Sequence, residues 1–497
     1  MNTFWKIFGI SLFIVAGCAA LLFWKQEDKT SGPGAGELVL YCAAGIKLPV
    51  AEAAARYERT YGVRVQLQYG GSGTLLSNLA IARTGDLYLA ADRSYLDAAR
   101  ARGLVAESVP LAVLRPVIGV RRGNPKNIRS VEDLLDGGVR LALANPEAAS
   151  IGRKTRKLLE QTGLWHQIEQ AAVVYKPTVT EIANDIKLGA VDAGVIWDAT
   201  ANQYEEIEAV RVPLFDGAAT EVVIGVLTSC RNPAAALRFC RYLGAPERGQ
   251  RVFANWGFEP APGGDRWSEH PEIVLFSGGV NRLAIKETVA EFSSREGVTV
   301  TTVYNGCGIL VAQMKAGERP DAYFACDVSF MTEVADIFLD TEDISSTPMV
   351  IAVAWGNPLG IKSLDDLARP GLRLGVANTQ QSALGALTAK LLKELGIYQA
   401  VMKNVNSRTP TADLLVNQLR TGSLDAVIVY QANLSRVRDL LGIVPIDHRS
   451  ALAVQPIGVA AETGYPRLTS RLVRAIRSAQ SEKRFRQAGF EWLVKAQ

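Results

Sequence analysis

The sequence contains two copies of one long pattern, and this internal repeat constrains the fold more than any other feature. The stretch 37–41 (ELVLY) recurs 235 residues later as 272–276 (EIVLF). The other matched pairs are 69–73 with 304–308, 86–92 with 321–327, 123–125 with 356–358, 144–145 with 377–378, and 188–193 with 421–426. The last three pairs are shifted by 233 residues, so the register is almost constant along the chain. The chain is therefore expected to hold two homologous modules.

The repeat divides the chain into four parts. We expect an N-terminal segment at 1–36, a first module at 37–260, a linker at 261–271 and a second module at 272–497. Each module is long enough to form a compact domain with its own core.

Within each module, short apolar runs alternate with amphipathic stretches. In the first module, strands are expected at 38–41, 63–69 and 85–90, with helices at 49–61 and 74–83. This β-α-β-α-β order predicts a parallel, doubly wound sheet with helices on both faces. The same order returns between residues 117 and 197, so each module is predicted to have two doubly wound α/β lobes around a cleft.

Composition excludes several function classes. The net charge is +4 over 497 residues and no basic block occurs, which argues against a nucleic-acid partner. The six cysteines form no C-x-x-C pair, and the three histidines, His166, His270 and His448, lie far apart. We therefore expect no zinc site, no histidine-based catalytic triad, no cofactor and no enzymatic activity.

The N-terminus carries an export or anchoring signal. The apolar run from Ile7 to Trp24 has 18 residues, which is just enough to span a bilayer core. Within it, 15–18 (VAGC) resembles a lipobox, in which Cys18 would be lipidated; a cleaved signal peptide is a third alternative. The Gly-, Ser- and Pro-containing stretch 29–36 reads as a tether. All three alternatives place the modules outside the cytoplasm, and the first two anchor them to the cytoplasmic membrane.

Several loops at predicted strand ends suit an anion. Gly71, Ser72 and Gly73 lie between a strand and a helix, where glycines let backbone N–H groups approach a ligand and a hydroxyl can donate. A tight turn with a Ser or Thr cap is the alternative. The matching candidates at three other helix starts or strand ends are Ala44, Gly45, Ser150, Ile151, Thr178, Val179 and Trp197. No lysine or arginine lies inside these turns, which predicts oxyanion binding by neutral dipoles and discrimination by cavity size.

The motifs in the first module resemble the periplasmic molybdate- and tungstate-binding family, a branch of the type II periplasmic binding-protein fold. They are 41–46 (YCAAGI), 71–75 (GSGTL), 85–92 (GDLYLAAD), 145–147 (NPE) and 194–197 (GVIW). The resemblance implies an oxyanion ligand and an ABC permease subunit as partner. It places ligand contacts at Ser72, Ile151 and Val179, and Trp197 at the position of the family's binding tyrosine. Gly45 replaces a serine that is usual in the family, and Asp198 is either a solvated carboxylate or a metal ligand.

The second module departs further from this pattern. Cys307 replaces Ser72, and Tyr430 takes the position of Trp197. Cys307 and Cys326 are expected to be buried free cysteines, with a disulfide or a thiolate ligand as the alternatives. Its candidate ligand residues are Gly279, Val280, Gly306, Cys307, Leu384, Ala412 and Tyr430.

The leading interpretation is a solute-binding protein that captures molybdate, tungstate or a similar oxyanion by lobe closure for ABC-type uptake. The alternative is a membrane-anchored oxyanion or metal sensor or scaffold, in which the second module is a protein-interaction domain. An enzyme on the same fold is disfavoured, because the Gly-Ser-Gly loop has no histidine partner nearby.

Overall fold

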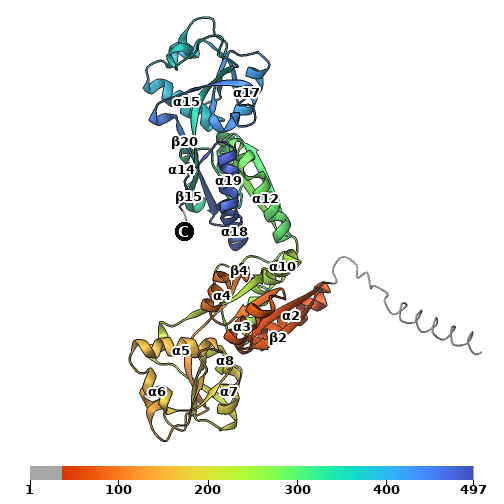
Figure 1. The fold of residues 1–497 in the computed structure, drawn as a ribbon, viewed down its shortest axis with the longest axis vertical. Helices are drawn as coiled ribbons and strands as arrows, with labels where there is room; N and C mark the ends of the chain where they lie inside the picture. Colours follow the sequence, from red (N-terminus) through yellow and green to blue (C-terminus); the bar gives the residue numbers. More distant parts are fainter. Residues whose placement is uncertain (1–35, 496–497) are drawn as a thin grey trace, which may run out of the picture.

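The computed structural model describes residues 36–495 of the chain. The predicted anchor helix, the lipobox and most of the tether lie outside these residues. Within the described part, no helix has both the length and the apolar character that crossing a bilayer requires. The two modules lie end to end along the long axis of the molecule (Figure 1).

The first lobe of module one is built on a six-stranded sheet of order β11-β4-β10-β3-β1-β2. Its strands are β1 (Glu37–Ala43), β2 (Arg64–Gly70), β3 (Leu87–Ala90), β4 (Val105–Leu114), β10 (Thr220–Leu227) and β11 (Glu259–Pro260). Its helices are η1 (Ala44–Ile46), α2 (Lys47–Tyr61), α3 (Ser72–Ala82), α4 (Arg93–Ala101), α10 (Pro233–Gly244) and α11 (Gly249–Asn255). β3 lies between β10 and β1 and is buried throughout, as its uninterrupted apolar sequence requires.

The second lobe of module one has a five-stranded sheet of order β7-β6-β8-β5-β9. Its strands are β5 (Pro116–Arg121), β6 (Leu141–Ala144), β7 (Ala172–Lys176), β8 (Ala193–Trp197) and β9 (Ile207–Val210). Its helices are η2 (Glu132–Leu135), α5 (Ser150–Gln161), α6 (Trp165–Ala171), α7 (Val179–Leu188), α8 (Asp198–Ala201) and α9 (Pro213–Asp216).

Module two repeats this arrangement on one ten-stranded sheet. Its strands are β12 (Glu272–Gly278), β13 (Thr299–Asn305), β14 (Ala322–Phe324), β15 (Phe338–Ala354), β16 (Leu374–Ala377), β17 (Val405–Thr409), β18 (Ala426–Tyr430), β19 (Leu441–Pro445), β20 (Leu452–Ala460) and β21 (Glu491–Trp492). Its helices are η3 (Gly279–Asn281), α12 (Arg282–Glu296), α13 (Cys307–Lys315), α14 (Val328–Thr332), η4 (Asp365–Ala368), α15 (Ala383–Glu394), α16 (Tyr398–Met402), α17 (Ala412–Arg420), η5 (Gln431–Leu434), η6 (Arg449–Ala451), α18 (Pro466–Ile476) and α19 (Ala479–Gln487).

The predicted parallel sheets are only partly confirmed. β1 pairs in parallel with β2 and β3, as the β-α-β-α-β order predicts. β10, however, runs antiparallel to β3 and β4, and β5 runs antiparallel to β8. The sheets are mixed because the chain leaves the first lobe through β4, builds the second lobe, and returns through β10.

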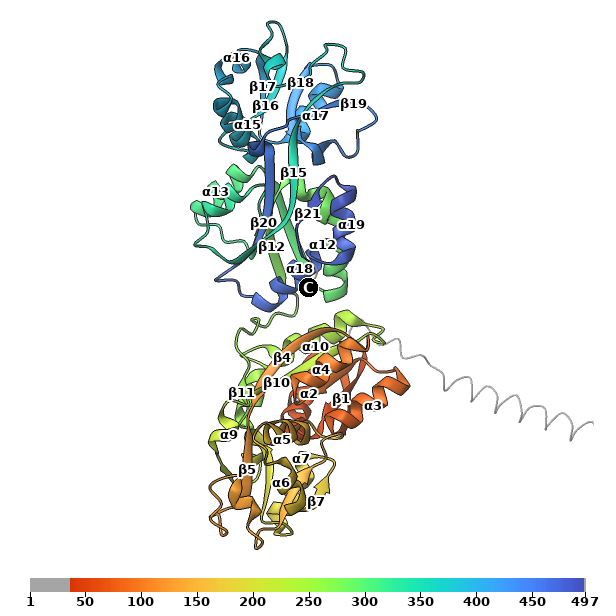
Figure 2. The same cartoon turned by 60° about the vertical axis from the view of Figure 1, so that its left-hand side comes forward.

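The two modules connect their lobes differently. In module one, β4 and β5 are separate strands that meet at Arg115, whose N–H donates to Asp198 Oδ1 (3.1 Å). In module two, β15 runs without a break, pairing with β20 in one lobe and with β18 in the other (Figure 2). Both arrangements place the lobe crossing at the point where the sheets face the cleft.

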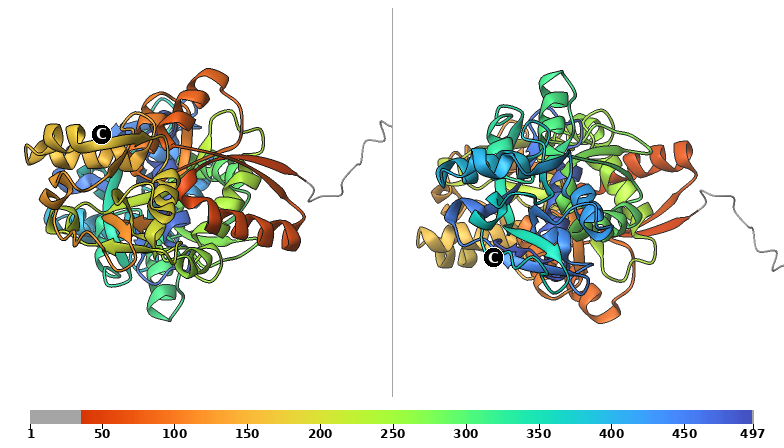
Figure 3. Two further views of the ribbon diagram at one scale, coloured as in Figure 1. Left: turned by 90° about the horizontal axis from the view of Figure 1, so that it is seen from below. Right: turned by 90° about the horizontal axis from the view of Figure 1, so that it is seen from above.

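The modules touch through packed side chains, and the connecting segment is not a free linker. α10 of module one packs against α12 of module two, and the views along the long axis show one module over the other (Figure 3). In the connecting segment, Asp265 is buried and its carboxylate accepts from the backbone N–H of Arg467 (2.7 Å), at the start of α18. The indole of Trp267 donates to the hydroxyl of Tyr61 (2.9 Å).

Candidate functional site

A small cavity lies between the two lobes of module one. Strand ends of β1, β2 and β3 reach it from the first lobe, and the starts of α5 and α7 reach it from the second. Its volume is about 10 Å³, so the cleft is nearly closed in this structure. The lining residues are Ala43, Ala44, Gly45, Gly70, Gly71, Ser72, Ala91, Ala149, Ser150, Ile151, Thr178, Val179 and Trp197. Nine of the ten candidates chosen from the sequence of module one are in this set; Gly73 is outside it.

Gly73 has a different part in the site, because it lets the lobes meet. Its N–H donates to the carbonyl of Ala148 in the other lobe (2.8 Å). A Cβ on Gly73 would lie 2.0 Å from the Glu147 carbonyl oxygen, and one on Gly71 would lie 2.4 Å from that of Ala148. These distances are far below van der Waals contact, so the backbone-to-backbone closure of the cleft requires glycine at both positions.

Ser72 is a buried hydroxyl at the start of α3. Its Oγ accepts from the N–H of Ala91 (3.3 Å), which leaves its own O–H free to donate toward a ligand. The residue that caps α3 is Gly71, which has no side chain, so the Ser72 hydroxyl does not cap the helix. The carbonyl of Ser72 accepts from the buried Tyr88 hydroxyl (2.7 Å), which fixes the turn.

Thr178 faces the same cavity, but its hydroxyl is already engaged. The Thr178 Oγ1 donates to the carboxylate of Glu181 (2.9 Å) and accepts from the Glu181 N–H (3.3 Å). Thr178 is the N-cap of α7, so its hydroxyl serves the start of that helix. What α7 offers the cavity is backbone: the N–H groups in the first turn of any helix have no partner within it. The same applies to Ile151 at the start of α5.

The structure gives a steric reason for Gly45. A Cβ at Gly45 would lie 2.7 Å from Cγ1 of Val179, so the space that a serine side chain would need is filled by this valine. Trp197 closes the cavity beside them and is 1% exposed. The valine and the indole together make this wall apolar.

Among the residues that the structure describes, no charged side chain lines the cavity. The three cations that neighbour it in sequence are engaged elsewhere. Arg153 stacks over the Tyr95 ring at 3.7 Å from its centroid, Lys176 pairs with Asp185 (2.8 Å), and Lys47 lies 5.2 Å from the centroid of a tyrosine ring. The electrostatic field inside the cavity therefore comes from helix starts and hydroxyls.

Asp198 serves the hinge. Its Oδ1 accepts from the N–H groups of Arg115 (3.1 Å) and Ala199 (2.8 Å), and burial raises its pKa. The Asp198 carboxylate is therefore partly buried and hydrogen-bonded, in contrast to the fully solvated group expected from the sequence. Within residues 36–495, no group of three or more His, Cys, Asp or Glu side chains is arranged to hold a metal ion.

Module two has an equivalent cavity of about 20 Å³. Six of its seven candidates line it: Gly279, Val280, Gly306, Leu384, Ala412 and Tyr430. The seventh, Cys307, forms a disulfide with Cys326, so the expectation of two free cysteines is wrong. The disulfide stands where Ser72 and Ala91 share a hydrogen bond in module one. The lobes close as in module one, because Gly308 N–H donates across the cleft to the carbonyl of Gln381 (3.1 Å).

Three buried polar atoms around the second cavity have no hydrogen-bond partner among the described residues. They are the Tyr430 hydroxyl and the side-chain oxygens of Asn281 and Asn433. Tyr430 and Asn433 line the cavity. Burial raises the pKa of the Tyr430 hydroxyl. Neither asparagine is among the candidates predicted from the sequence. The signal that could have found them is that they replace Ile46 and Thr200 of module one at the repeat register.

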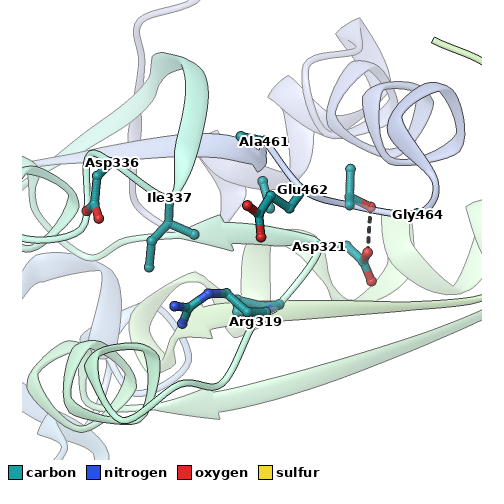
Figure 4. A pocket seen from close by; sticks show the side chains of 10 residues that line it. Arg319, Asp321, Asp336, Ile337, Ala461, Glu462 and Gly464 are labelled. Carbon is teal, nitrogen blue, oxygen red and sulfur yellow. Dashed lines mark hydrogen bonds between the residues drawn. The ribbon is translucent and has the colours of Figure 1, made fainter.

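A larger hollow of about 390 Å³ lies away from both clefts, at the other end of the first-lobe sheet of module two (Figure 4). One of its carboxylates, that of Asp321, accepts from the Thr463 hydroxyl (2.5 Å) and from the N–H of Val274 (2.8 Å). Asp86 of module one likewise accepts from Val39 (2.9 Å). This repeated aspartate is therefore a structural tie between strands.

Two hinged α/β lobes that close backbone to backbone over a small cavity define a ligand-binding module, and the chain has two of them. The chain belongs to the family of bacterial extracellular solute-binding proteins, whose pattern matches residues 38–259 and 273–491. Proteins of this family act outside the cytoplasm and are typically binding proteins, not enzymes. The resemblance identified from the sequence is confirmed.

Individual relatives match one module's length. A binding protein of Haemophilus influenzae is 30% identical over 229 residues, covering 46% of this chain and 92% of its own. The molybdate-binding protein ModA of Mycobacterium tuberculosis is 28% identical over 254 residues, covering 50% of this chain and 95% of its own. Among solved structures, the periplasmic molybdate-binding protein of Azotobacter vinelandii has a TM-score of 0.39 and 16% identity, covering 44% of this chain and 98% of its own.

Proposed function

We propose that the chain captures a small tetrahedral oxyanion, molybdate or tungstate, in the cavity of module one and presents it to an ABC permease subunit. One observation carries the proposal: Ser72, Ile151 and Val179 come from three helix starts in two lobes and line one cavity without a charged side chain. Helix starts direct N–H groups and partial positive charge at an anion.

Neutral donors suit this task energetically. Burying a lysine or arginine as counter-ion would require its desolvation, which costs several kcal/mol per ion. First-turn N–H groups are unpaired within their helix, so they can solvate the anion at a smaller cost. With no strong charge to attract every anion, cavity size becomes the main basis of selection. The printed names of the ModA relatives support molybdate as a member of the ligand class.

The ligand contacts are Ala44, Gly45, Gly71, Ser72, Ser150, Ile151, Thr178, Val179 and Trp197, with Gly73 acting through closure. The modules span 37–260 and 272–497, and the N-terminal segment attaches them to the cytoplasmic membrane. Permease delivery requires the lobes to open and release the ion.

The second candidate function is an anchored oxyanion sensor or scaffold. It is favoured by one observation, that the Cys307–Cys326 disulfide replaces the Ser72 donor in module two. In this alternative, module one binds the oxyanion and module two engages a protein.

Isothermal titration calorimetry of the full chain with molybdate, tungstate, sulfate and phosphate tests the proposal. We expect saturable binding of molybdate or tungstate, and a ligand at a hundredfold excess over its Kd should add about 2.7 kcal/mol of stability. Ser72→Ala should weaken binding by about 1–2 kcal/mol, since a donor to an anion is lost. Ser77→Ala, exposed on the same helix, is the matched control. Absence of binding for all four ions would overturn the proposal.

A further inference from the structure

A cleft much larger than either lobe cavity lies between the two modules. Its volume is about 750 Å³, within the range of sites that hold organic ligands. Module one contributes residues of α4 and β4, the connecting segment contributes Pro262 and Gly263, and module two contributes α18. A ligand in this cleft would therefore touch both modules at once.

All charged residues that line this cleft are arginines: Arg93, Arg100, Arg467, Arg471 and Arg474. On α18 the lining positions 467, 470, 471 and 474 follow helical spacing, so three guanidiniums and the Ser470 hydroxyl share one helix face. On the opposite wall, Arg100 Nη2 donates to the Ser108 hydroxyl (2.6 Å), which holds it at the cleft.

The surrounding carboxylates neutralise this arginine cluster only in part. Arg93 pairs with Glu221, and Arg100 lies 3.5 Å from Asp97 on the same helix. Arg471 pairs with Glu296 (2.7 Å), which it shares with another arginine. Arg467 donates to backbone carbonyls, among them Pro110 O (2.6 Å), and has no carboxylate partner for its guanidinium among the described residues.

Arg474 is the clearest excess charge. No ion pair or hydrogen bond of its side chain is found within residues 36–495. Its pKa is lowered by burial and by the neighbouring charges of Arg471, Arg100 and Arg477. The acids of the adjoining hollow are already engaged: Glu107 pairs with Arg295, and Glu291 pairs with Arg484. The cleft is thus lined by arginines from both modules, and the clearest uncompensated charge is that of Arg474 of module two.

We propose that this inter-module cleft binds a soluble polyvalent phosphate, of the di- or triphosphate class, that bridges the two modules. Guanidinium forks match phosphate oxygens in pairs, and several converging arginines favour an anion with several charges. A single tetrahedral ion contacts one or two arginines, whereas a chain of phosphates reaches α4 on one wall and α18 on the other. The bound ligand would hold the modules in one relative orientation.

Titration calorimetry of the full chain with pyrophosphate and with inorganic triphosphate, in about 0.15 M salt, tests this inference. Wild-type protein should bind one triphosphate saturably and bind orthophosphate far more weakly. Arg100→Ser and Arg474→Ser should each weaken triphosphate binding about 10-fold, as loss of one charge-assisted contact predicts. Arg420→Ser, at the exposed end of α17 in the far lobe, should leave the affinity unchanged.

The outcomes separate this inference from the oxyanion site. Ser72→Ala should leave triphosphate binding intact, and Arg474→Ser should leave molybdate binding intact. Equal affinities for wild type, Arg100→Ser and Arg474→Ser would overturn the inference, as would a loss in Arg420→Ser of the same size. Binding only to vesicles containing phosphatidylglycerol, without binding of triphosphate, would also overturn it.

Discussion

Glu296 offers the sharpest test of how the modules are held together. It ends α12, is 2% exposed, and one carboxylate receives two arginines from different modules. Arg471 of module two donates through Nε to Oε1 (2.7 Å) and through Nη2 to Oε2 (3.0 Å), while Arg241 of module one donates through Nη1 to Oε2 (3.1 Å). The two guanidiniums are themselves 8% and 4% exposed, so solvent cannot replace the carboxylate.

Glu296→Ala should therefore destabilise the chain by about 3–5 kcal/mol, the cost of leaving a buried charge without its partner. Equilibrium urea unfolding, followed by circular dichroism, measures the change in the free energy of unfolding. Glu291→Ala, which removes an exposed carboxylate from the same helix, should change it by less than about 1 kcal/mol. If Glu296→Ala and Glu291→Ala unfold at the same urea concentration, the modules do not depend on this buried ion pair.

Three further predictions concern the clefts. Gly73→Ala should weaken oxyanion binding at least about 10-fold, because the added Cβ would lie 2.0 Å from a carbonyl oxygen across the closed cleft. The control Gly137→Ala adds a Cβ in open space and should bind the oxyanion normally. Calorimetry that finds equal affinities for the two variants would contradict this prediction. Tyr430→Phe should raise the free energy of unfolding of the ligand-free chain by about 1 kcal/mol, because it removes a buried hydroxyl without a partner. The control Tyr398→Phe, at a partly exposed position, should leave the free energy of unfolding unchanged. A loss of stability in Tyr430→Phe would show that the hydroxyl is hydrogen-bonded. Burial raises the pKa of Asp198, so the contribution of this group to stability is fully present below its unfolded-state pKa and is lost as pH rises through its folded-state pKa. Urea unfolding measured from pH 3 to pH 7 should therefore show wild type losing stability relative to Asp198→Asn. Parallel stability profiles for the two proteins would refute this prediction.

The sequence predicted the repeat, the lobes and most of the site because these depend on local patterns. The strand predicted at 63–69 corresponds to β2 (Arg64–Gly70) within one residue at each end. The site loops were found because small residues between an apolar run and a helix mark a strand end, and strand ends of an α/β lobe face one cleft. The mixed sheet was not predicted, because the direction of β10 depends on the chain returning from the second lobe.

The missed features depend on contacts between distant residues. Gly73 carries the motif of a ligand loop, but its position is fixed by the carbonyls of Glu147 and Ala148, which belong to the other lobe. Thr178 was chosen for its hydroxyl, and only the geometry reveals that Glu181 engages it. The disulfide was missed for the same reason, because no local sequence pattern shows whether Cys307 contacts another cysteine in the folded chain.

The arginine cleft could not be foreseen from composition, because the net charge of the chain is only +4. Its members are spread over both modules and become one cluster when α4 and α18 face each other. Spacing along α18 was visible in the sequence, but the same spacing is typical of any solvated helix face.

The most direct test of the central claim is a crystal structure of the full chain grown with tungstate, with anomalous diffraction measured at the tungsten edge. The account predicts a tungsten peak in the cleft of module one, with oxygens within hydrogen-bond distance of Ser72 Oγ and of the N–H groups of Ile151 and Val179. A tungsten peak only at charged surface groups, with the module-one cavity closed and filled by side chains or water, would contradict it.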